Sequence, residues 1–106
     1  MDNLSMVNKL ILFGLSRQEA ELYICLLKNS ELTGYEVAKL TGISRSNVYN
    51  GLAALVEQGA AYVKEGTSVK YVAVAMNEFC DNYIRHLQKA REYLVLNEPK
   101  RVINAD

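Results

Sequence analysis

The chain has 106 residues, of which half are hydrophobic and 23% are charged, and its twelve Lys and Arg balance its twelve Asp and Glu. This length suits one domain with a modest core, and the composition is that of a folded protein. No apolar run approaches the roughly 18 residues of a transmembrane helix. The N-terminus also lacks the basic start and cleavage site of a signal peptide. We therefore expect a cytoplasmic location without membrane contact, in which Cys25 and Cys80 stay as buried free thiols.

Glycines and capping signals divide the first sixty residues into helices. Gly14, Gly42 and Gly59 each follow an apolar-periodic stretch, where a left-handed residue commonly ends a helix. Residues 16–19 and 33–36 match the capping box, in which a hydroxyl and a carboxylate bind free amides at a helix start. The predicted helices cover about 3–13, 17–29, 34–41 and 45–58, the last with Ser44 as N-cap.

The predicted helix at 45–58 contains a conflicting signal. Val48, Leu52 and Leu55 form a continuous apolar stripe at helical spacing. An Asn-Gly pair ending at Gly51 would by itself indicate a hairpin turn. Because the stripe continues through the pair, we favour a helix, in which glycine costs about 1 kcal/mol relative to alanine. We expect Gly51 to lie where another backbone, from protein or DNA, comes close.

After Gly59 the apolar period changes to two, which is typical of strands. Residues 61–64 and 69–75 predict a β-hairpin whose four-residue tip is 65–68. A long helix follows at 77–97, with a length of about 31 Å at 1.5 Å per residue. Residues 98–106 are predicted to be a flexible tail.

The order of these elements indicates a function. A short helix, a tight turn containing glycine and a capped helix form a helix-turn-helix, and a hairpin directly after it makes a winged helix. The fold class is therefore mainly α with a small β-hairpin, with residues 1–75 as a DNA-binding domain. The start of the fourth helix is polar and lies off the apolar stripe, in residues Ser44, Arg45, Ser46, Asn47, Tyr49 and Asn50.

These residue types suit a recognition helix. Arginine can bind guanine, and asparagine can bind adenine, through two hydrogen bonds each. Short hydroxyl donors and helix-start amides suit phosphates. In the hairpin, or wing, Lys64, Thr67, Ser68 and Lys70 are candidate phosphate contacts. The alternative is that both segments are ordinary solvated surface.

The last helix has a pattern of its own over residues 76–97. Apolar positions spaced four and three residues apart form a coiled-coil seam, which predicts a homodimer. The candidate interface consists of Met76, Phe79, Cys80, Tyr83, Leu87, Ala90 and Leu94. The alternative is an amphipathic helix packed on its own domain. A dimer would bind a pseudo-palindromic double-stranded operator.

Residues 9–75 resemble the N-terminal domain of the TrmB family of transcriptional regulators. The matching stretches are LILFGLSRQEAELYICLL, ELTGYEVAKLTGISRSNVYNGLAALVEQGA and VKYVAV. The resemblance implies that SRSNVYNGL is the recognition helix, with DNA contacts from Ser44, Arg45, Ser46, Asn47 and Tyr49. Three positions depart from the family pattern, namely Gly51, Ala60 and Ala61. Longer members carry a C-terminal sugar-binding domain that has no counterpart here, so sugar sensing is not expected.

Other classes of function fit less well. No catalytic constellation, cofactor motif or phosphate loop is recognisable, so we expect neither an enzyme nor a cofactor. A metal-sensing regulator would use Cys80, Asp81 and His86, but Cys80 and His86 point different ways on one helix. A winged helix that binds protein instead of DNA is consistent with the zero net charge. The polar start of the fourth helix opposes that alternative.

Overall fold

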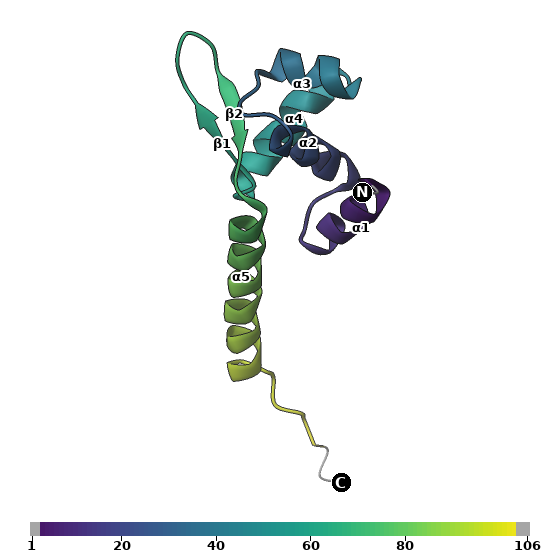
Figure 1. Ribbon diagram of the computed structural model, residues 1–106. Coiled ribbons are helices and arrows are strands. Elements are labelled where there is room, and N and C mark those ends of the chain that lie inside the picture. The colour runs from purple at the N-terminus through teal and green to yellow at the C-terminus, as the bar shows by residue number, and fades with distance from the viewer. Residues whose placement is uncertain (1–2, 104–106) are drawn as a thin grey trace.

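The computed structural model describes residues 3–103, and within them a helical body carries one hairpin and one projecting helix (Figure 1). The fold class predicted from the sequence is confirmed: it is a winged helix followed by a long C-terminal helix. The elements in chain order are α1 (Asn3–Leu12), α2 (Arg17–Leu27), α3 (Gly34–Thr41), α4 (Arg45–Glu57), β1 (Ala61–Lys64), β2 (Lys70–Ala73) and α5 (Met76–Leu96).

Local hydrogen bonds account for the helix ends. The Ser16 hydroxyl accepts from the Glu19 amide at 3.1 Å, and the Glu19 carboxylate accepts from the Ser16 amide at 3.0 Å. Thr33 and Glu36 form the same reciprocal pair at 3.1 and 2.8 Å. Both predicted capping boxes are therefore confirmed. The predicted left-handed glycines also have positive φ angles, of 91°, 74° and 77° at Gly14, Gly42 and Gly59.

The core gathers around α2, which packs against α1, α3, α4 and β2. The predicted stripe of α4, formed by Val48, Leu52 and Leu55, is fully buried. A Cβ atom at Gly51 would overlap the Cδ1 methyl of Leu22. The close neighbour at this position is thus a side chain of α2, rather than the backbone or DNA expected from the sequence, and the glycine lets α2 and α4 approach each other.

The hairpin pairs Ala61 with Ala73 and Lys64 with Lys70 in antiparallel register. Residues 65–69 connect the two strands, so the connection is one residue longer than predicted. The segment before α3 pairs with β2 at one position, where Leu32 and Tyr71 exchange backbone hydrogen bonds of 3.1 and 2.7 Å. This bridge ties the hairpin to the helices.

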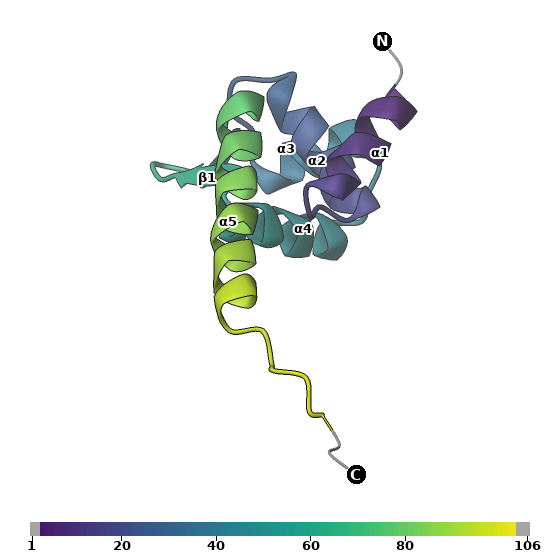
Figure 2. The same ribbon diagram turned by 90° about the horizontal axis from the view of Figure 1, so that it is seen from below.

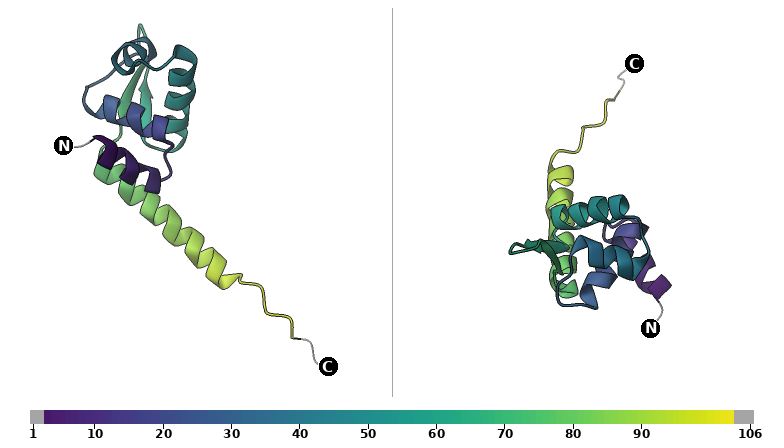
Figure 3. Two further views of the ribbon diagram at one scale, coloured as in Figure 1. Left: turned by 90° about the vertical axis from the view of Figure 1, so that its right-hand side faces the viewer. Right: turned by 90° about the horizontal axis from the view of Figure 1, so that it is seen from above.

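Only the first turns of α5 pack on the domain, and the rest extends away from it (Figures 2 and 3). Phe79 is 2% exposed and lies against Tyr23, with ring centroids 5.5 Å apart. A ring enclosed in this way has no surface left for a partner, which corrects the prediction that Phe79 lies in a dimer interface. Tyr83 lies beside Phe13 with ring centroids 5.7 Å apart, so it also contacts its own domain.

Candidate nucleic-acid interface

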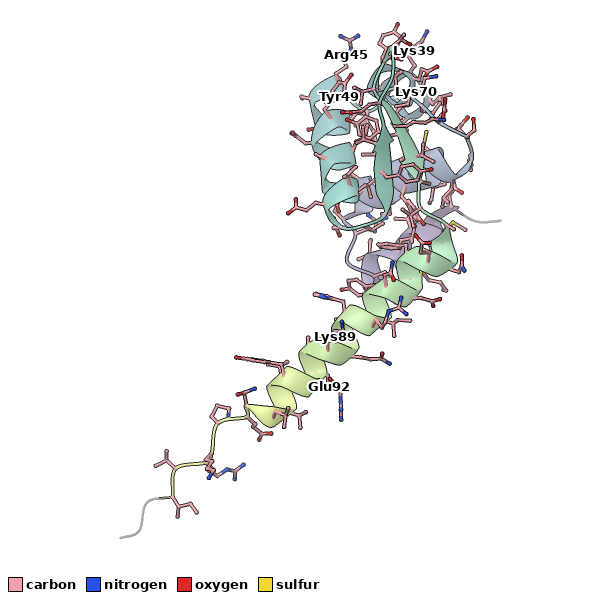
Figure 4. The ribbon with its side chains drawn as sticks, turned by 90° about the vertical axis from the view of Figure 1, so that its left-hand side faces the viewer. Lys39, Arg45, Tyr49, Lys70, Lys89 and Glu92 are labelled. Carbon is pink, nitrogen blue, oxygen red and sulfur yellow. The ribbon has the colours of Figure 1, made fainter. Side chains whose placement is uncertain are left out.

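The start of α4, the helix α3 and the hairpin meet at the end of the molecule that faces away from α5. In Figure 4 the labelled side chains of Lys39, Arg45, Tyr49 and Lys70 gather at this end, while Lys89 and Glu92 lie far along α5. We call this region, which is built from residues 33–50 and 61–73, the α3/α4 end.

The buried stripe of α4 fixes which side chains face solvent here. Because Val48 and Leu52 point into the core, the intervening polar positions of the first turns must point outward. The predicted recognition residues are all exposed: Ser44, Arg45, Ser46, Asn47, Tyr49 and Asn50. Ser44 takes the N-cap position, but its side chain makes no capping bond. The positive end of the α4 dipole is therefore not covered by that hydroxyl.

The aromatic ring of Tyr35 in α3 contacts two cationic side chains at the α3/α4 end. The Arg45 guanidinium lies over the Tyr35 ring at 5.0 Å from its centroid, and the Lys39 ammonium lies at 5.6 Å. Neither Tyr35 nor Lys39 was predicted from the sequence to contact DNA. The two residues lie four apart on one short helix, which puts both side chains on the same face. This spacing is the feature of the sequence that could have identified them.

Tyr49 is positioned by a glycine. A Cβ atom on Gly34 would overlap the ring of Tyr49, so the ring lies directly against the backbone at the start of α3. The ring is half-exposed. Gly34 has no positive φ angle, so close approach is the reason for glycine at this position.

The two lysines of the wing share one carboxylate. Lys64 Nζ lies 3.0 Å from Glu31 Oε2, and Lys70 Nζ lies 3.3 Å from Glu31 Oε1. These hydrogen bonds, chiefly the one from Lys64, lower the pKa of the Glu31 carboxyl, and Glu31 in turn raises the pKa of the Lys64 ammonium. Both amines therefore hold the hairpin to the segment before α3, a role that the sequence did not indicate. Thr67 and Ser68 are exposed in the connection between the strands.

The rest of the predicted dimer surface divides into two parts. Met76, Cys80 and Tyr83 are half-buried against their own domain. Leu87 is 49% exposed and Leu94 66% exposed, so these large apolar side chains are uncovered. Ala90, between them on the seam, is also exposed.

Within residues 3–103 no three His, Cys, Asp or Glu side chains come together as metal ligands could. Burial raises the pKa of the Cys25 and Cys80 thiols, both of which are free and half-buried. Over the same range, none of the helices combines the length and the hydropathy of a membrane span.

Comparison with known proteins points to one family. The model of the sugar-specific transcriptional regulator TrmB matches residues 10–77. YrhO of Bacillus subtilis (strain 168), an uncharacterized protein, is 38% identical over 79 residues, which make up 71% of this chain and 29% of YrhO. TrmBL2, an archaeal chromatin protein whose structure shows a novel mode of DNA binding, superposes with a TM-score of 0.84 at 26% identity. That match covers 90% of this chain and 37% of TrmBL2. This chain thus spans less than two fifths of the length of either relative.

A more distant structure supports the fold alone. Sco5413, a MarR family transcriptional regulator from Streptomyces coelicolor, gives a TM-score of 0.58 at 18% identity, over 89% of this chain and 67% of that one. The family match covers well over half of the chain, and it includes every helix and strand from α2 to β2. The chain therefore belongs to the TrmB family of transcriptional regulators.

Proposed function

We propose that this chain binds double-stranded DNA sequence-specifically through its α3/α4 end and regulates transcription as a homodimer. The observation that carries the proposal is the exposed polar start of α4, which is held outward by a fully buried stripe and flanked by basic side chains. A helix presented in this way fits the major groove with its first turns against the base edges.

The exposed residues suit different parts of the duplex. Arg45 is the candidate for guanine, and Asn47 and Asn50 are candidates for adenine, since these side chains can make paired hydrogen bonds to those bases. The hydroxyls of Ser44, Ser46 and Tyr49 would donate to phosphates, helped by the positive end of the α4 dipole.

The wing would follow the sugar-phosphate backbone beside the groove. Thr67 and Ser68 are exposed and carry short hydroxyl donors. Lys64 and Lys70 bring positive charge, although each must share its ammonium between Glu31 and a phosphate. Phosphate contacts of this kind add affinity for every sequence alike.

The exposed half of α5 supports a homodimer. Leu87, Ala90 and Leu94 leave an uncovered apolar stripe on a helix that otherwise projects into solvent. The α3/α4 end and the free end of α5 lie at opposite ends of the molecule (Figure 1). Two copies can therefore present both α3/α4 ends to one duplex only if their α5 helices run parallel. Such a dimer binds a pseudo-palindrome with half-sites roughly 34–36 Å apart. We place this activity in the cytoplasm.

The proposal is tested by selecting duplexes from a randomised 30-base-pair pool and measuring affinity for the selected duplex by fluorescence anisotropy. Arg45→Ala should cost about 1–3 kcal/mol on that duplex and relax the preference at one position of each half-site. Arg101→Ala is the matched control, because it removes the same charge from an exposed site beyond α5. If the unaltered protein selects no sequence, or if Arg45→Ala binds as tightly as the control, the proposal is wrong.

A further inference from the structure

The Arg45 side chain is exposed, yet it is not unrestrained. Its guanidinium lies 5.0 Å from the centroid of the Tyr35 ring, within the distance at which a cation is attracted to the face of an aromatic ring. In the part of the chain that the structure describes, no carboxylate forms an ion pair with Arg45. The ring is thus the group that holds the guanidinium.

Restraint of this kind matters for base reading. An arginine side chain carries rotamer entropy that it must lose when both of its nitrogens bind one guanine. A ring that already holds the guanidinium lowers that loss, so the free protein is closer to the bound geometry. The ring comes from α3, whereas the arginine comes from α4, so the contact also fixes the arginine relative to the helix before the turn.

Lys39 provides a comparison within the same cluster. Its ammonium lies 5.6 Å from the same ring, but it is a compact charge with rotating donors, and it suits a phosphate better than a base edge. The Tyr35 ring therefore contacts both a guanidinium suited to base recognition and an ammonium suited to a phosphate.

We infer that Tyr35 is a specificity-determining residue that positions the Arg45 guanidinium for base recognition without contacting a base itself. This inference rests on the proposed function. Tyr35 acts through its ring, so Phe should replace it and an aliphatic residue should not. Lys39 contributes positive charge for a neighbouring phosphate.

The experiment uses the full chain and the duplex that the unaltered protein selects from a randomised pool. Affinity and selected sequence are compared for Tyr35→Leu, Tyr35→Phe, Arg45→Ala and the double variant Tyr35→Leu/Arg45→Ala. Tyr35→Leu should weaken binding about two- to fivefold, the factor that a cation–π contact at an exposed site represents. It should relax the sequence preference at the same base pairs as Arg45→Ala, while Tyr35→Phe behaves as the unaltered protein. The double variant should show no further relaxation of the sequence preference than Arg45→Ala alone.

Three results would overturn the inference. If Tyr35→Leu leaves the selected sequence unchanged while Arg45→Ala relaxes it, the ring does not position the arginine. Equal losses in Tyr35→Phe and Tyr35→Leu would mean that the hydroxyl contacts DNA directly. Additive losses of sequence preference in the double variant would mean that the two residues act independently. A thermal melt of each variant checks folding, and Tyr35→Gln replaces Tyr35→Leu if the latter unfolds. Should the unaltered protein select no duplex, the proposed function fails, and the inference fails with it.

Lys39→Gln separates the two roles assigned to the cluster. It should weaken binding to all duplexes alike and reduce the salt slope by about one unit, with the selected sequence unchanged. A change of sequence preference in Lys39→Gln would instead assign base reading to the lysine and contradict the division proposed for this ring.

Discussion

Replacing Tyr23 by Phe should loosen the attachment of α5 to the domain. The Tyr23 hydroxyl donates to the Val74 carbonyl at 2.7 Å, and this bond joins α2 to the segment between β2 and α5. Phe keeps the ring that packs on Phe79 but leaves the carbonyl without this donor. Because Tyr23 is fully buried and Val74 is half-buried, we expect a loss of about 1–2 kcal/mol in the free energy of unfolding.

The stabilisation by the Tyr23 hydroxyl should decrease at high pH. Burial, with a smaller effect from nearby Cys80, raises the pKa of Tyr23 to about 12 from its usual value of 10.0. Above pH 10 the unfolded chain loses this proton, whereas the folded protein keeps it up to about pH 12. The stabilisation by Tyr23 is therefore complete below pH 10 and falls by about 1.4 kcal/mol per pH unit above it.

Urea unfolding at pH 7, 9 and 11 measures both effects at one fixed protein concentration. The difference between the unaltered protein and Tyr23→Phe should be nearly constant from pH 7 to 9 and should shrink by about 1.3 kcal/mol by pH 11. Tyr93→Phe makes the same change at a residue that is 67% exposed and should have no effect. A difference that stays the same at pH 9 and 11 would refute the reasoning on the buried hydroxyl.

Three further predictions concern α5, the core and the wing. Leu87→Glu should dissociate the proposed dimer, because it puts an unpaired charge into the seam. Leu96→Glu, at the exposed end of α5, should leave the dimer intact. Light scattering gives the mass of each variant, and a dimeric Leu87→Glu protein would contradict the proposed seam. Gly51→Ala should lower the free energy of unfolding by about 0–2 kcal/mol, since the cost of overpacking against Leu22 exceeds the gain in helix propensity. An increase in melting temperature would contradict this and show that Leu22 moves freely. The Glu31 carboxyl should titrate below pH 4.5 by carbon NMR, so its ion pairs persist above that pH and are lost as pH falls through its lowered pKa. Its midpoint should rise when both wing lysines become Gln, and an unchanged midpoint would mean that they do not cause the shift.

Local signals explain why most of the fold could be predicted. Capping boxes and left-handed glycines act over four or five residues, so Ser16 and Gly42 mark helix ends wherever the helices finally pack. The stripe of α4 was recognised for the same reason. The contact of Leu22 with Gly51 was not predicted, because it joins α2 and α4, which are distant in the sequence.

The features that escaped prediction depend on contacts between distant segments. Glu31 meets the wing lysines across more than thirty residues, and the Leu32 bridge to Tyr71 spans a similar separation. Phe79 flanks the predicted seam, but it lies in the first turn of α5 and packs on Tyr23. The sequence pattern alone cannot tell a partner helix from the chain's own core. Tyr35 was overlooked because its role follows from where Arg45 lies in space.

The central claim, that the α3/α4 end binds duplex DNA, is tested most directly by mapping amide chemical shifts while the selected duplex is titrated into labelled protein. We expect saturable changes concentrated in residues 33–50 and 61–73, with the largest at the start of α4, and little change over residues 3–12 of α1. Saturable changes centred on α1 or on the exposed part of α5, with residues 44–50 unaffected, would contradict the account.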